Sequence, residues 1–325
     1  MSLLDIHGLS TRLASEAGWV HALDDLSLAI EKGQTFALVG ESGCGKSMTA
    51  LSIARLLPDS GAIVAGRVCL SESSGSASTD VLRISETAMR TLRGKRIAMI
   101  FQEPGTSLNP VMTVGDQLTE VICLHTGASK QQALQEAAQW LERVGIPEPA
   151  KRLQQYPFEM SGGQKQRVMI AMALSVKPDL LIADEPTTGL DVSIQAQVLD
   201  LLKTLQREQG MAMLLITHDL AIVKQMADTV GLMYAGQLVE KASVAEFFAH
   251  PRHPYAHALV KSLPSQAQRG YALYALEGRV PSLVNPKPGC RFEARCIHAQ
   301  ENCGVSTHEL LQASETHEVR CFYHA

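Results

Sequence analysis

A glycine-rich stretch has the residue types and the spacing of a phosphate-binding loop. Residues 40–47 read Gly-Glu-Ser-Gly-Cys-Gly-Lys-Ser and fit the pattern G-x-x-x-x-G-K-[S/T]. Glycines let the backbone wrap closely around phosphate, while Lys46 can reach the terminal phosphates and Ser47 can ligate Mg²⁺. The residues expected to contact a nucleotide are Gly40, Ser42, Gly43, Cys44, Gly45, Lys46 and Ser47. The alternative is a glycine-rich surface turn, and in either case Cys44 is interpreted as a small side chain without a redox role.

Two carboxylates follow an apolar run further along the chain. Leu180–Ala183 has the composition of a buried strand, and Asp184 and Glu185 come directly after it. Ligands bind at the carboxyl ends of strands in open α/β sheets. We therefore expect Asp184 to hold Mg²⁺ and Glu185 to orient and deprotonate a water that attacks the γ-phosphate. Without the phosphate loop upstream, such a pair would be interpreted as a solvated turn.

Short apolar runs and amphipathic stretches alternate around these residues. The runs with the composition of buried parallel strands are Thr35–Val39, Ile97–Phe101, Leu180–Ala183 and Met213–Ile216. Helical patterns cover Met48–Leu57, Lys130–Val144 and Gln195–Arg207. This alternation predicts an α/β fold with a parallel sheet. The polar stretch Glu72–Asp80, which is rich in serine, is expected to be an exposed loop.

The composition limits the class of protein. The 325 residues are 46% hydrophobic and 19% charged, which excludes disordered and collagen-like chains and favours two domains. The net charge of −4 argues against a protein that coats nucleic acid. The most apolar runs, Val168–Val176 and Met211–Ile216, are shorter than the ~20 residues that span a bilayer, and we find no signal-peptide pattern. We expect a cytosolic chain, or one that sits on a membrane through a partner.

Four of the seven cysteines lie close together near the C-terminus, after the strand–helix alternation fades near 235–260. They are Cys290, Cys296, Cys303 and Cys321. In a reducing compartment such a set points to metal rather than to disulfides, and thiolates suit zinc or an iron–sulfur cluster. The spacings are wider than the C-x2-4-C knuckles of zinc ribbons, which modestly favours iron–sulfur. Four unlinked cysteines are the remaining alternative.

The stretch Ser161-Gly162-Gly163-Gln164 has the composition of a helix N-terminus that could face an anion, with a serine cap and two glycines. The alternative interpretation is a capped surface helix without a ligand. It also resembles the signature sequence of ATP-binding-cassette (ABC) ATPases, usually Leu-Ser-Gly-Gly-Gln, with Met160 in the place of the leucine.

Other motifs of that family occur in the expected order. Gln102 resembles the glutamine that senses Mg²⁺ and nucleotide, Asp191 ends a Gly-Leu-Asp that resembles the D-loop, and His218 resembles the switch histidine that holds the γ-phosphate. Trp19 stands where the family places an aromatic residue that stacks on adenine. A lone tryptophan or histidine is otherwise more often a structural residue.

The resemblance covers residues 1–250 and implies a RecA-like P-loop core with a parallel sheet, an antiparallel β subdomain and a helical signature subdomain near 104–170. It implies ATP and Mg²⁺ as ligands. It also implies two cassettes facing head to tail, so that Ser161 and Gly163 of one chain serve the ATP held by Lys46 of the other.

Residues 251–325 resemble the C-terminal extension of oligopeptide and dipeptide importer ATPases. The similar stretches are Pro251–Tyr255, Gly289–Phe292, Arg295-Cys296 and Glu315–Cys321. In that family the four cysteines of several members hold a [4Fe–4S] cluster, and zinc is the alternative here. Three nearby histidines, His298, His308 and His317, are each expected to be solvated surface.

The resemblance implies the energy-coupling subunit of an importer for dipeptides or oligopeptides, located peripherally on the cytoplasmic face of the inner membrane. The implied partners are a second ABC ATPase subunit in a heterodimer, two transmembrane permease subunits and an extracytoplasmic peptide-binding protein, with no nucleic acid. Relatives carry nickel chelates, glutathione or antimicrobial peptides, so these solutes are alternatives. A non-transport ABC ATPase and a metal-binding module without ATPase activity are the remaining readings, and the intact motifs argue against the latter.

Overall fold

The computed structural model describes residues 2–71, 78–263, 276–305 and 309–323. The chain divides into two compact units that alternate along the sequence. Unit 1 contains Glu31–Gly33 and Arg83–Leu215, and unit 2 contains Ser2–Ile30, Gln34–Leu82 and Ile216–Ala325. Among the described residues, no helix combines the length and the apolar composition that crossing a membrane requires.

Unit 2 contains an antiparallel sheet with the strand order β2-β1-β4-β5. Its strands are β1 (Ser2–Ser15), β2 (Gly18–Glu31), β4 (Gly61–Ser71) and β5 (Ser78–Asp80). The prediction of a loop over Glu72–Asp80 is wrong for its last three residues, because Ser78–Asp80 forms a strand that pairs with the end of β4. Pairing with a long neighbouring strand overrides the polar composition there. Residues 72–77 of that prediction lie outside the described residues.

Unit 2 also contains strands in the order β11-β12-β10-β9-β3. They are β3 (Thr35–Val39), β9 (Thr229–Tyr234), β10 (Gln237–Ser243), β11 (Leu311–Ser314) and β12 (His317–Val319). β3 is buried at all five positions and runs parallel to β9, as its continuous apolar run predicts. β10, β11 and β12 pair antiparallel, so the sheet is mixed rather than wholly parallel as expected.

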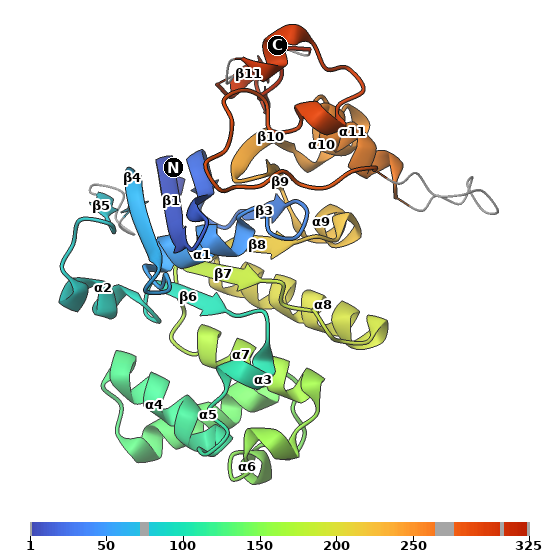
Figure 1. Cartoon of the computed structure of the whole chain (residues 1–325). Coiled ribbons are helices and arrows are strands. Elements are labelled where there is room, and N and C mark those ends of the chain that lie inside the picture. The colour runs from blue at the N-terminus through green and yellow to red at the C-terminus, as the bar shows by residue number, and fades with distance from the viewer. Residues whose placement is uncertain (1, 72–77, 264–275, 306–308, 324–325) are drawn as a thin grey trace. The chain divides into compact units, whose positions relative to one another are not determined.

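The C-terminal segment packs on the core of unit 2. The helices of this unit are α1 (Lys46–Ala54), α9 (Leu220–Met226), α10 (Val244–Ala249) and α11 (Pro254–Lys261), with short 3-10 turns η3 (Glu293–Arg295) and η4 (Glu301–Gly304). Tyr234 of β9 packs edge-on against Tyr255 of α11 and against Phe292, with ring centroids 4.9 and 5.1 Å apart. All three side chains are buried in one cluster with residues of β3. In Figure 1 the orange and red C-terminal segment lies beside β10 and α11.

Unit 1 combines two parallel strands with a group of helices. β6 (Ile97–Ile100) pairs parallel with β7 (Leu180–Asp184), and the order continues to β8 (Ala212–Thr217), whose last two residues belong to unit 2. The helices are α2 (Glu86–Leu92), α3 (Pro104–Ser107), α4 (Val114–Thr126), α5 (Lys130–Arg143), α6 (Pro149–Arg152), α7 (Gly162–Leu174) and α8 (Val192–Gln209), with the 3-10 turn η1 (Pro157–Glu159). α4, α5 and α7 contact one another and form the helical group drawn in green in Figure 1. The strands and helices expected from the sequence are therefore present, with ends shifted by a few residues.

Candidate active site

The glycine-rich loop of unit 2 joins β3 to α1 and has the geometry that glycine permits. Gly40 and Gly45 have φ angles of 154° and 107°. A Cβ on Gly40 would lie 2.3 Å from the carbonyl oxygen of Met233, and one on Gly45 would lie 2.4 Å from that of Ala22. Gly45 is the N-cap of α1 and offers no side chain to the N–H groups of the first turn. Such N–H groups favour an anion at this helix N-terminus.

Lys46 turns back onto the loop from which it projects. Its ammonium donates to the carbonyl oxygens of Gly40 at 2.8 Å and Glu41 at 3.0 Å. Cys44 is fully buried, and burial raises the pKa of its thiol, which fits an inert small side chain. Ser42 and Gly43 are exposed and Ser47 is half-buried. The loop therefore presents its middle to solvent and keeps its lysine within the fold.

Trp19 and His218 belong to the same unit. The Trp19 side chain on β2 is 47% exposed, which is unusual for so large an apolar group. Its backbone oxygen accepts the N–H of Asn285 at 3.2 Å. His218 follows β8 with an exposed side chain, and Asp219 caps α9 directly after it.

The predicted carboxylates and Gln102 belong to unit 1. Asp184 is buried at the end of β7. Glu185 follows with a φ of 46°, a strained left-handed conformation for a residue other than glycine. Its Oε2 accepts the side-chain amide of Gln102 at 3.0 Å and the hydroxyl of Thr188 at 2.8 Å. The structure thus brings Gln102 and Glu185 together, a contact that the sequence analysis did not predict.

The signature stretch begins α7. Ser161 accepts the Gln164 N–H at 3.3 Å, and the Gln164 side chain accepts the Ser161 N–H at 3.0 Å, which is a capping box. Ser161, Gly162 and Asp191 are exposed. A cavity of about 400 Å³ is lined by Ser161, Gly162, Gly163, Gln164, Gly189, Leu190 and Asp191, among others. The signature and the D-loop therefore share one open hollow of unit 1.

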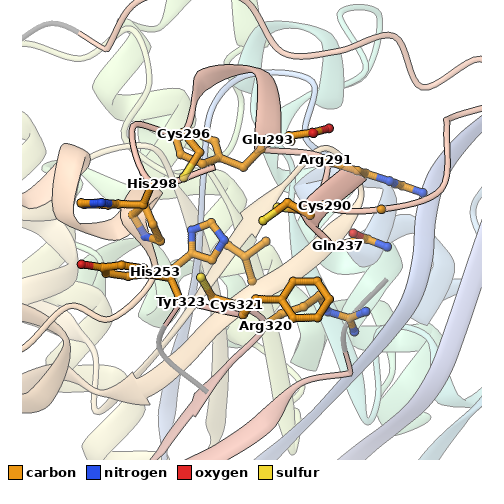
Figure 2. Close-up of a pocket in the computed structure, with 16 residues that line it drawn as sticks. Gln237, His253, Cys290, Arg291, Glu293, Cys296, His298, Arg320, Cys321 and Tyr323 are labelled. Carbon is orange, nitrogen blue, oxygen red and sulfur yellow. The ribbon is translucent and has the colours of Figure 1, made fainter. Parts of the chain in front are cut away.

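The four C-terminal cysteines line one small cavity of about 30 Å³ in unit 2. Figure 2 shows Cys290, Cys296 and Cys321 around it, and Cys303 completes the set. All four are free thiols. Burial raises the pKa of Cys290 to about 11, with the three neighbouring thiols adding to the effect. Within the described ranges, no three His, Cys, Asp or Glu side chains are arranged to hold a metal ion.

The expectation of solvated histidines is wrong for His317. This residue of β12 is fully buried, with its Nε2 2.8 Å from Glu240 and its Nδ1 3.1 Å from Glu246. Glu240, also fully buried, accepts the N–H of His253 at 2.5 Å as well. His298 is exposed as expected, and His308 lies outside the described residues.

Comparison with known proteins identifies the family. Residues 23–188, which include the phosphate loop, the carboxylates and the signature, match the family described as ABC transporter. The chain belongs to the ABC transporter family. Residues 239–303 of this ABC ATPase match the oligopeptide/dipeptide transporter C-terminal region.

Full-length relatives extend the match to the whole ABC ATPase. A Brucella abortus protein named for peptide import is 48% identical over 98% of this chain and 96% of its own length. The dipeptide transport ATP-binding protein DppD of Bacillus subtilis is 44% identical over 98% of this chain and 94% of its own. The solved dimeric cassette MJ0796, bound to ADP and Pi, is 24% identical with a TM-score of 0.65 and covers 74% of this chain and 98% of that one. This last likeness supports the ABC ATPase fold.

Sequence reasoning missed several residues around the site of this ABC ATPase. Thr188 donates a hydrogen bond to Glu185. Its hydroxyl side chain, three residues after Glu185, was the feature of the sequence that could have indicated this contact. Glu41 occupies a variable position of the phosphate-loop pattern, so nothing marked it. Arg295 and Tyr255 contact Glu41 from distant parts of the chain. No local pattern could have joined them.

Proposed function

We propose that this ABC ATPase is the energy-coupling subunit of an importer for dipeptides or oligopeptides. The observation that carries the choice of solute is the match of residues 239–303 to the C-terminal region of oligopeptide/dipeptide transporters. Relatives named for peptide or dipeptide transport, similar along the full chain, support it. Within this proposal residues 1–250 form the nucleotide-binding domain, with a helical subdomain near 104–170, and residues 251–325 form the extension.

In the proposed mechanism unit 2 binds the nucleotide. The backbone amides of the loop, including those of Ser42, Gly43 and Gly45, cradle the phosphates. Lys46 exchanges its bonds to the carbonyl oxygens of its own loop for bonds to the phosphates, so an internal pair is replaced by a stronger charged one. Trp19 offers its exposed face to adenine, and His218 holds the γ-phosphate.

Unit 1 supplies the groups that act on the attacking water. Glu185 takes the proton of that water, and its bonds to Gln102 and Thr188 orient the carboxylate. In unit 1, Asp184 and Gln102 carry oxygens suited to Mg²⁺, and in unit 2 the Ser47 hydroxyl does, because carboxylate, amide and hydroxyl oxygens are hard ligands. Mg²⁺ bound by these residues would supply positive charge that offsets the charge developing on the phosphate oxygens.

A second cassette completes the arrangement in this proposal. Ser161, Gly162 and Gly163 begin a helix at an open hollow, and Gln164 and Asp191 lie beside them. An exposed helix N-terminus with small residues suits the phosphates of a nucleotide held by another chain. The partner is a second ABC ATPase subunit, and the heterodimer remains our preferred form.

Two permease subunits and an extracytoplasmic peptide-binding protein are the other proposed partners, which place the chain on the cytoplasmic face of the inner membrane. Purification of the complex from its native membrane, followed by identification of the co-purifying chains, tests this. We expect two permeases and a second cassette. Co-purification of ribosomal proteins or nucleic acid in place of the permeases would contradict the transport proposal. A nickel chelate, glutathione or an antimicrobial peptide as the transported solute would redirect it, and competition for uptake distinguishes these solutes from dipeptides.

We also propose that Cys290, Cys296, Cys303 and Cys321 hold a [4Fe–4S] cluster, with zinc as the alternative. The four thiols face one cavity, and thiolate is the donor both metals prefer. The spacings of the four cysteines are wider than the C-x2-4-C knuckles of zinc ribbons, and this modestly favours the cluster. The metal would stabilise the extension.

Metal analysis of anaerobically purified protein tests the cluster. We expect brown protein with iron and acid-labile sulfide at about four each per chain. Cys303→Ser should lower the iron and sulfide content. Cys123 lies outside the cavity, so Cys123→Ser should leave both contents unchanged. Colourless protein with one zinc per chain would favour the alternative metal.

A further inference from the structure

The C-terminal extension reaches the phosphate loop through a nearly buried ion pair. Arg295 of η3 donates from Nη1 to the Glu41 carboxylate at 2.9 Å. The Arg295 side chain is 6% exposed and that of Glu41 is 29% exposed. Arg295 is itself fixed, because its Nε donates to the carbonyl oxygen of Glu277 at 2.9 Å and its Nη1 lies 3.2 Å from the hydroxyl of Tyr234. A pair this sheltered from water is stronger than an exposed one.

A second contact holds the backbone of the same loop residue. The Glu41 N–H donates to the Tyr255 hydroxyl at 3.1 Å, and the Tyr255 ring packs against the rings of Tyr234 and Phe292. The Glu41 carbonyl oxygen accepts a hydrogen bond from the ammonium of Lys46. Glu41 is therefore bound through its side chain and its N–H by the C-terminal part of the chain, and through its C=O by the lysine of the loop.

The extension also borders the strand that carries Trp19. The N–H of His21 donates to the carbonyl oxygen of Leu283 at 2.8 Å, and the Asn285 N–H donates to that of Trp19 at 3.2 Å. Val20 and Val284 form an antiparallel bridge between these two bonds. One segment of the extension thus fixes the backbone of the proposed adenine-stacking residue, while another fixes the phosphate loop.

We propose that the C-terminal extension sets the affinity of this cassette for ATP, with Arg295 and Tyr255 as positioning residues that act through Glu41. The inference rests on the proposed nucleotide role of the loop. Without the Arg295–Glu41 ion pair, the loop backbone that accepts the hydrogen bonds of Lys46 becomes more mobile. ATP binding must then order this backbone, and the entropy lost in doing so weakens the affinity. We expect a loss of about tenfold in affinity, a common size for coupling between sites. Because coupling is reciprocal, bound nucleotide must also stabilise the extension.

The experiment measures the dissociation constant of Mg²⁺ with a non-hydrolysable ATP analogue on the full chain. The variants are Arg295→Met, Arg295→Lys, Glu41→Gln and the double variant Glu41→Gln/Arg295→Met. Lys241→Met is the matched control, since it removes another ion pair of unit 2, the one between Lys241 and Glu318 at 2.6 Å. Lys46→Ala is the benchmark for loss of the phosphate loop, and thermal unfolding separates affinity from stability.

We expect Arg295→Met and Glu41→Gln each to weaken binding about tenfold, the double variant to add little, and Arg295→Lys to recover part of the loss. Lys241→Met should bind like wild type. Hydrogen exchange in residues 290–296 should slow when the analogue is bound, which a merely structural pair would not require. Wild-type affinity in Arg295→Met and Glu41→Gln, with binding lost in Lys46→Ala, overturns the inference and leaves the proposed function intact. Unchanged affinity in Lys46→Ala contradicts the proposed function itself.

Discussion

The phosphate loop and the signature helix are held in place by contacts of opposite range. Glu41 in the loop binds Tyr255 and Arg295, which lie 214 and 254 positions further along the chain. Ser161 and Gln164 at the start of α7 bind each other across three positions. A capping box forms wherever a helix begins with the right residues. The phosphate loop depends on contacts with distant segments of unit 2.

The two regions also differ in what they leave open. Lys46 is 6% exposed, and its ammonium bonds to carbonyl oxygens of its own loop. Ser161, Gly162 and Asp191 stand exposed at a hollow of about 400 Å³. A region completed by its own chain suits a ligand that the chain binds itself. An open region at a helix N-terminus suits an anion brought by another chain, as proposed above.

The largest expected effect is that of Glu185→Gln on turnover. Glutamine can still bind Gln102 and Thr188 but cannot accept a proton, so the proposed general base is lost while the local geometry is kept. We expect ATP hydrolysis by the assembled complex to fall about 10²–10⁴-fold while nucleotide still binds. Phosphate release and trapped nucleotide, measured on the same preparation, separate the two effects.

Glu120→Gln on α4 is a suitable control for this substitution, because its side chain is an exposed carboxylate elsewhere in unit 1. It should hydrolyse ATP like wild type. Hydrolysis by Glu185→Gln at a rate close to that of this control would remove Glu185 from the role of base.

The comparison also explains which features could be predicted from the sequence. β3 and β7 were predictable because continuous apolar runs that end at glycine or carboxylate are typical of buried strands. The start of α7 was predictable because serine and glutamine three residues apart form its cap. Glu185 was predictable from its place after a buried strand, and Gln102 needed the family resemblance, but the hydrogen bond between them was not predictable, since no local rule pairs residues 83 positions apart.

Long-range polar contacts could not be predicted, and His317 illustrates why. A histidine between polar neighbours, here Thr316 and Glu318, is usually solvated. In the structure β12 pairs with β10, which places His317 beside Glu240 in the interior of unit 2. The same limit applies to Arg295 and Tyr255, whose partners are set by tertiary packing rather than by their own neighbours.

A smaller effect compares the stability of the two kinds of contact. His317→Leu leaves the buried carboxylate of Glu240 with fewer donors, so we expect a loss of about 2 kcal/mol in the free energy of unfolding. Ser161→Ala removes an exposed local cap and should cost about 1 kcal/mol. Urea unfolding followed by hydrogen exchange assigns each loss to its unit.

The matched control for His317→Leu is Glu318→Gln, which disrupts a half-exposed ion pair on the same short strand and should cost about 0–1 kcal/mol. Equal losses in His317→Leu and Glu318→Gln would show that the buried network contributes no more than a surface pair. The distinction between long-range and local support would then fail for unit 2.

The smallest expected effect is that of substituting Trp19, the exposed aromatic residue proposed to stack on adenine. The Trp19 side chain is 47% exposed, and its backbone oxygen accepts the N–H of Asn285, so a partly open ring projects from an anchored strand. If it stacks on adenine, Trp19→Ala should weaken ATP binding about fivefold, or about 1 kcal/mol, and Trp19→Phe should retain most of the affinity. If the ring instead serves the fold, the same truncation should cost about 3–5 kcal/mol of stability, as for a core tryptophan. Titrating both variants with nucleotide and unfolding them in urea decides between these roles, because stacking predicts a change in affinity with stability retained, and packing predicts the reverse.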